Sequence, residues 1–209
     1  QASYFCYTKI YMTLEHFLSQ PGSIVTGLHL LGVALGIGGA TVADILFFRF
    51  LKNYRISKGE KSILEICSKI LWLALLILFI TGLGLFFLDA ENLLTNGKFQ
   101  MKMIALGIIF VNGIALNMIV TPWLLKIPFD APSKTMTSKV RLMRHLSFML
   151  GAVSFVSWYF IFCISALRDV VLPLGPLFIL YSTCIGLGII GSQFFEQRIS
   201  KKAHKEKRK

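Results

Sequence analysis

The sequence predicts an all-α integral membrane protein: a five-transmembrane-helix bundle with its N-terminus outside and its C-terminus in the cytoplasm. Of 209 residues, 55% are hydrophobic and only 15% are charged, which is too few polar residues to cover a soluble domain. Five stretches reach the roughly 20 apolar residues needed to cross about 30 Å of hydrocarbon. Backbone groups in lipid must bond internally, and the alternating pattern of a membrane β-barrel is absent, so helices are expected.

Charged residues, glycine, asparagine or proline bound each of the five stretches. They cover residues 23–48, 64–88, 101–125, 143–166 and 170–194. The preceding segment mixes aromatic and charged residues, includes His16 and ends at Pro21-Gly22, which predicts an external interfacial helix. We therefore divide the chain into an external interfacial segment 1–22, a five-span membrane domain 23–195 and a basic cytoplasmic tail 196–209.

The distribution of basic residues predicts the orientation. The net charge is +12, from 22 Lys and Arg against 10 Asp and Glu. Basic residues gather around the first and third connections between spans: Arg49, Lys52, Arg55, Lys58 and Lys61, and Lys126, Lys134, Lys139, Arg141 and Arg144. The other two connections are nearly neutral. By the positive-inside rule the basic connections are cytoplasmic, and the basic tail falls on the same side. The charge is therefore assigned to membrane topology and lipid, with no nucleic-acid partner.

One face of the first span carries small and polar residues. At about 100° per residue, His29, Gly32, Gly36, Ala40 and Asp44 share this face. Two interpretations are open. The face is either a seam that packs against another helix, with His29 hydrogen-bonded across it, or a haem site. In the second case the imidazole ligates the iron, and Gly32 or Gly36 leaves room for the flat macrocycle.

Other titratable residues extend this interpretation. Lys102, early in the third span, lies in the same half of the membrane as His29. It either snorkels to the headgroups or pairs with an anionic group such as a haem propionate. His145 lies near the other side of the membrane, on the order of 20 Å from His29, so one haem cannot bridge the two. A second axial ligand would instead come from the external segment, from His16 or, as a softer ligand, from Met12 one turn before it.

The other polar residues in the spans are expected to form contacts within the helix bundle. Asp44 is expected to form an ion pair with Arg49 or to cap a neighbouring helix. Asn112 and Asn117 are expected to form hydrogen bonds between helices. The fourth and fifth spans are joined by a tight turn and should be neighbours. The four cysteines have no metal-binding spacing and are expected to be packing residues.

Three segments carry a family resemblance. They are Leu28-His29-Leu30-Leu31-Gly32 followed by Gly38-Gly39, then Thr81-Gly82, and then Lys102 with Asn117 and Pro122. Over residues 24–125 the chain resembles the bacterial superfamily of the copper resistance D membrane proteins and the membrane-embedded, haem-binding protoporphyrinogen oxidase. The resemblance implies that His29 and Lys102 match the His and Lys associated with haem binding and activity in the oxidase. The sequence departs from the family pattern in two ways: Gly36 or Ile37 replaces the usual Trp, and external Met residues are few. Copper transport is therefore less favoured, and activity on porphyrinogen does not follow from the resemblance.

The sequence contains no phosphate-binding glycine loop, GxSxG elbow or HExxH motif, so any chemistry belongs to a cofactor. We expect a b-type haem protein of the bacterial cytoplasmic (inner) membrane that transfers electrons with a partner membrane redox protein. It would be a component of a haem-dependent membrane oxidoreductase. His29 is the expected metal ligand, and the cofactor-binding residues are His29, Gly32, Gly36, Lys102 and His16.

Two alternatives remain open. The first is a cofactor-free accessory subunit that packs in a larger complex, or in a homo-oligomer, through the glycines of residues 32–39 and 186–191. The second is a copper or small-solute transporter, which would need a hydrated path between facing helices.

Overall fold

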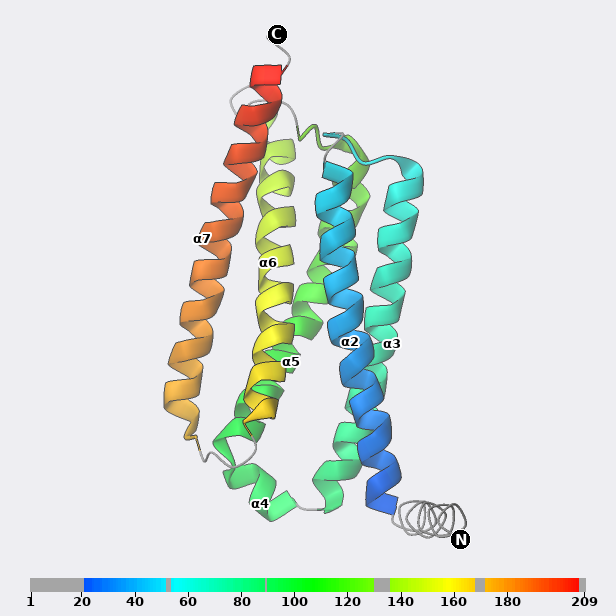
Figure 1. The fold of residues 1–209 in the computed structure, drawn as a ribbon, viewed down its shortest axis with the longest axis vertical. Coiled ribbons are helices and arrows are strands. Elements are labelled where there is room, and N and C mark those ends of the chain that lie inside the picture. The colour runs from blue at the N-terminus through cyan, green and yellow to red at the C-terminus, as the bar shows by residue number, and fades with distance from the viewer. Residues whose placement is uncertain (1–20, 52–53, 89, 130–135, 168–171, 207–209) are drawn as a thin grey trace, which may run out of the picture.

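The computed structural model describes residues 21–51, 54–88, 90–129, 136–167 and 172–206, with the backbone alone for Pro21 and 201–206. All regular elements in these ranges are helices (Figure 1). The long ones are α2 (Pro21–Phe50), α3 (Lys58–Leu88), α5 (Gly97–Ala115), α6 (Ser138–Ala166) and α7 (Leu174–Glu206), and a short α4 (Ala90–Thr95) precedes α5. The helical segment that begins with α5 continues to Lys126. With this extension, the structure has five helices that are long and apolar enough to cross a membrane: α2, α3, the extended α5, α6 and α7. The prediction of five helical spans is confirmed.

The third span is not a uniform α-helix. After α5 the chain forms a π-helical turn, η2 (Leu116–Val120), and then a 3-10 helix, η3 (Thr121–Lys126). The cause is Pro122, which has no N–H and would clash with the carbonyl four residues earlier in an α-helix. The carbonyl of Leu116 accepts hydrogen bonds from both the backbone N–H and, at 2.9 Å, the hydroxyl of Thr121. π-turns of this kind are frequent at functional sites.

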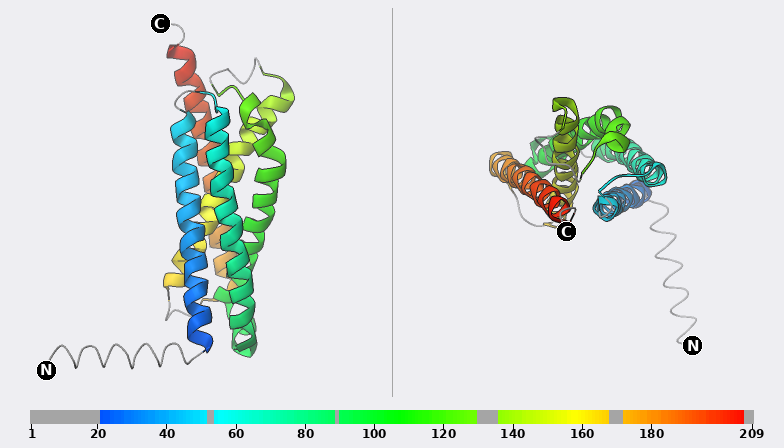
Figure 2. Two further views of the ribbon diagram at one scale, coloured as in Figure 1. Left: turned by 90° about the vertical axis from the view of Figure 1, so that its right-hand side faces the viewer. Right: turned by 90° about the horizontal axis from the view of Figure 1, so that it is seen from above.

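Four of the long helices surround a common interior. α2 packs against α3 and α6, α5 packs against α6, and α3 approaches the end of the third span at η3. α7 lies on the outside, against α6 and α5 (Figure 2). The predicted contact between the fourth and fifth spans is therefore confirmed.

The two ends of the bundle differ in charge. We call one of them the basic end: there α2 ends, α3 begins, and the residues include Arg49, Arg55, Lys58, Lys126 and Lys139. At this end the two connecting segments pack together through buried apolar side chains, Leu51, Ile56, Ile127 and Phe129. The N–H of Phe129 also donates to the carbonyl of Tyr54 at 3.1 Å. The chain therefore forms an apolar layer over the interior at its basic end.

The outer surfaces of the helices are apolar. Large exposed hydrophobic side chains occur on every long helix, for example Leu30, Phe79, Val111, Phe162 and Ile190. A soluble protein rarely exposes apolar surface over so many elements, whereas lipid requires it. The lipid bilayer is therefore the environment of this bundle.

The helix ends depart from the sequence prediction. α2 opens at Pro21, a residue that fits the first helical position because its missing N–H would be unpaired there. α3 begins six residues earlier than the predicted 64, at Lys58, where Ser57 and Glu60 form a reciprocal capping box. α7 begins at Leu174 instead of 170, just after Pro173, and continues as a helix into the predicted tail. The predicted interfacial helix lies outside the described residues.

Candidate functional site

His29 lies where α2 meets α3, in the half of the bundle opposite the basic end. Its Nδ1 is 2.9 Å from Oγ1 of Thr81, and that hydroxyl donates to the carbonyl of Ile77 at 2.6 Å. Because the single hydroxyl proton is used in this bond, Nδ1 of the imidazole is the donor to Thr81. Nε2 then carries the lone pair. Metal-ligating histidines are held in this way, with one ring nitrogen fixed by a hydrogen bond and the other free to bind the metal.

Lys102 approaches the same region from α5. Its ammonium is close enough to His29 to interact with it electrostatically, and Lys98 acts on Lys102 in turn. Lys98 also donates to the carbonyl of Leu167 at 2.5 Å. Lys102 is half-buried and forms no ion pair with the acidic residues that the structure describes. The structure thus brings together His29 and Lys102, the two residues that the family resemblance singles out.

Gly32 and Gly36 serve helix packing. A Cβ added to Gly36 would collide with the ring of Trp158 on α6. At Gly32 it would lie 3.0 Å from Ile77 and 3.1 Å from Leu78 on α3. The glycines therefore allow close approach of neighbouring helices, as in the first interpretation of this face. The fit to a haem is partial: the imidazole is oriented as a ligand, whereas side chains fill the space expected for the macrocycle.

Among the histidine side chains that the structure describes, no second one completes this site. His16 lies outside the described residues. His145 is near the basic end, far from His29 as expected, with Nδ1 at 2.6 Å from Oε2 of Glu196 and at 2.8 Å from Oε1 of Gln193. Within the described part of the chain, no group of three or more His, Cys, Asp or Glu side chains could hold a metal ion.

A buried ion pair links α6 to α7 near His145. Nε of Arg144 is 2.6 Å from Oε1 of Glu196, and these side chains are 1% and 2% exposed. The sequence analysis missed this pair, since it assigned Arg144 to a basic connection and Glu196 to the tail. The available signal was an acidic residue, Glu196, at the beginning of a basic tail.

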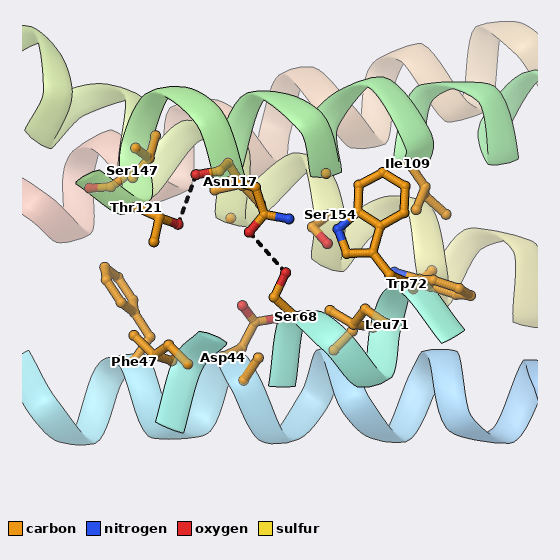
Figure 3. Close-up of a pocket in the computed structure, with 18 of the residues that line it drawn as sticks. Asp44, Phe47, Ser68, Leu71, Trp72, Ile109, Asn117, Thr121, Ser147 and Ser154 are labelled. Carbon is orange, nitrogen blue, oxygen red and sulfur yellow. Dashed lines mark hydrogen bonds between the residues drawn. The ribbon is translucent and has the colours of Figure 1, made fainter. Parts of the chain in front are cut away.

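A cavity of about 150 Å³ lies between α2, α3, η2 and α6 (Figure 3). Its polar lining residues are Asp44, Ser68, Asn117, Thr121, Ser147 and Ser154, and its aromatic ones are Phe47, Trp72 and Trp158. Oγ of Ser68 donates to Oδ1 of Asn117 at 3.0 Å across the cavity wall. Asn112 donates to the carbonyl of Leu150 at 3.0 Å. The prediction of hydrogen bonds between helices from Asn112 and Asn117 is confirmed.

Asp44 reaches this cavity from α2, and one of its carboxylate oxygens, Oδ2, is buried without a hydrogen-bond partner among the described residues. The expected ion pair with Arg49 is not formed between these two described residues, and Arg49 is exposed. The prediction was wrong because residues five apart on a helix are separated by about 140° around the axis. Asp44 therefore faces the interior while Arg49 faces outward.

Comparisons of the chain with protein-family models, with characterised proteins and with solved structures gave no match. Function is therefore inferred from the chain's own residues.

Proposed function

We propose that this chain is a b-type haem protein of the bacterial cytoplasmic membrane and exchanges electrons with a partner membrane protein. The observation that carries the proposal is the hydrogen bond from His29 Nδ1 to Thr81. It leaves Nε2 as a ligand for iron and fixes the ring in place. Bound haem supplies one-electron chemistry, and the protein supplies the axial ligand, the surrounding charge and the exclusion of water.

Lys102 supports the same assignment. A cation in the low-dielectric interior needs an anionic partner, and a haem propionate would provide one close to His29. The resemblance to the copper resistance D and protoporphyrinogen oxidase superfamily implies a role for these same two residues. Because basic residues favour the cytoplasm, we place the basic end inside and the His29 site in the outer half of the membrane.

The test is a reduced-minus-oxidised absorption spectrum of the full chain purified in detergent, beside two histidine variants. We expect a b-type α-band in the wild type, its loss in His29→Ala and its retention in His145→Gln. His145 is the matched control because it is also a half-buried histidine in a span but lies near the basic end. A colourless wild type after expression with ample haem would refute the proposal, as would an α-band of undiminished intensity in His29→Ala.

A second candidate, the cofactor-free accessory subunit, is favoured by one observation on α7. A Cβ added to Gly186 or Gly191 would meet no described atom within 4 Å, so the helix surface at these two glycines is open to a partner helix, whereas Gly188 between them packs against Val156 of α6. Such a subunit would be colourless and would purify with one partner at a fixed ratio. A large residue at Gly191 would then release the partner, whereas the same change would leave the spectrum of a haem protein unaltered.

A further inference from the structure

We propose that the cavity at Asp44 is a second site, independent of the haem, that binds a small organic ammonium ion. Asp44 lies 15 residues after His29 on α2, which is about 22 Å along a helix. The two sites therefore lie in opposite halves of the membrane and do not share side chains.

The side chain of Asp44, when it is ionised, requires a positively charged partner. A buried carboxylate that lacks a partner is either neutralised by a proton or paired with a cation, and none of the described residues bonds to Oδ2. Within membranes such groups face the bundle interior or a cavity and mark binding sites for ions. Asp44 meets this description because it lines the cavity directly.

Two hydroxyl oxygens at the cavity, those of Ser68 and Thr121, can accept hydrogen bonds from a ligand. Ser68 uses its proton in the bond to Asn117, and Thr121 uses its own in the bond to the carbonyl of Leu116. The remaining lone pairs of both hydroxyl oxygens can accept hydrogen bonds from a ligand. Hydroxyl oxygens together with a carboxylate suit a ligand that carries donors and positive charge.

The walls and the volume indicate an organic cation. Phe47, Trp72 and Trp158 line the cavity, and aromatic rings attract alkylammonium groups through cation–π interactions. The described residues contain no group of carboxylates and imidazoles typical of a divalent metal site. A volume of about 150 Å³ matches a cavity known to hold benzene, so about six heavy atoms fit. Ethylammonium and tetramethylammonium are within this limit.

Tryptophan fluorescence provides the assay. The chain has three tryptophans, and two of them, Trp72 and Trp158, line the cavity. The Trp123→Phe variant therefore reports on the cavity alone. With the full chain in lipid nanodiscs, we expect a saturable fluorescence change on titration with ethylammonium and none with ethanol, its neutral analogue.

Asp44→Asn keeps the shape of the side chain and removes its charge. We expect it to weaken ethylammonium binding by about 30-fold or more, the effect of losing one partner of a buried charge pair. Glu65→Gln is the matched control, because this carboxylate is also on a membrane-spanning helix but is 43% exposed and paired with Lys61. It should bind as the wild type does.

Ser154→Leu provides an independent test if Asp44→Asn does not fold. It fills part of the cavity while leaving the carboxylate of Asp44 in the chain, and it should also abolish binding. The proposal is overturned by the absence of saturable binding in the wild type, by equal binding of ethanol, or by unchanged affinity in a folded Asp44→Asn or Ser154→Leu protein. Both variants retain His29, so the haem spectrum tests the other site separately.

Discussion

Replacing Glu196 by Gln should destabilise the bundle far more than an ordinary change of surface charge. The carboxylate lies 2.6 Å from Nε of Arg144, and both side chains are almost fully buried, at 2% and 1% exposure. The variant removes the carboxylate that pairs with the buried guanidinium. Breaking such a pair costs about 3–5 kcal/mol. At about 2–4 °C per kcal/mol for a chain of this size, the unfolding midpoint should fall by about 6–20 °C.

Thermal unfolding in detergent, followed by circular dichroism, measures this effect. The control is Glu65→Gln, which breaks the Lys61–Glu65 pair of 2.9 Å between side chains that are 25% and 43% exposed. An exposed pair contributes about 0–1 kcal/mol, so this midpoint should fall by no more than about 4 °C. Equal midpoints for the two variants would show that Glu196 does not stabilise the buried guanidinium.

A double variant separates the loss of charge from the loss of packing. Arg144→Met with Glu196→Leu removes both charges and keeps apolar bulk at the interface of α6 and α7. Buried ion pairs can often be replaced in this way with little loss of stability. We therefore expect its midpoint to lie well above that of Glu196→Gln. If its midpoint is as low as that of Glu196→Gln, the loss of stability comes from the changed shape of the side chain and not from the lost charge.

Three further changes test other contacts. Thr81→Val removes the hydroxyl that holds the imidazole and should weaken haem affinity about 10–100-fold in titrations of the apoprotein; unchanged affinity would contradict the assigned role. Gly36→Ala places a methyl group against Trp158 and should cost about 1–3 kcal/mol in unfolding experiments, unlike Gly38→Ala, whose Cβ meets nothing within 4 Å. Asn96→Ala removes the acceptor for two N–H groups at the start of α5 and should cost about 1 kcal/mol, and a neutral effect would exclude capping.

The number of spans could be predicted because hydropathy is a local property of the sequence. The hydrogen bonds between helices from Asn112 and Asn117 could also be predicted, since an amide in a span needs a partner. The common location of His29 and Lys102 followed from their depths in their spans.

Features that depend on how helices pack could not be predicted. Gly36 lies against Trp158, a residue more than a hundred positions away, and hydropathy does not show which helices are neighbours. The cavity at Asp44 depends on four helices and on the π-turn before Pro122. That proline was visible in the sequence, and its effect on the preceding turn was the missed signal.

The attachment of α7 has a consequence for how the chain is assembled in the membrane. A hydrogen bond of 2.7 Å between Tyr181 and Ser157 joins it to α6 near its start. Further along, the Arg144–Glu196 ion pair and the contacts of His145 with Gln193 and Glu196 join the same two helices. α2, α3, α5 and α6 contact one another without it, so they can associate first. Until α7 docks, the guanidinium on α6 lacks the carboxylate of Glu196. Docking of the last helix therefore brings two opposite charges together inside the bundle, so the final assembly step includes an electrostatic contribution as well as apolar packing.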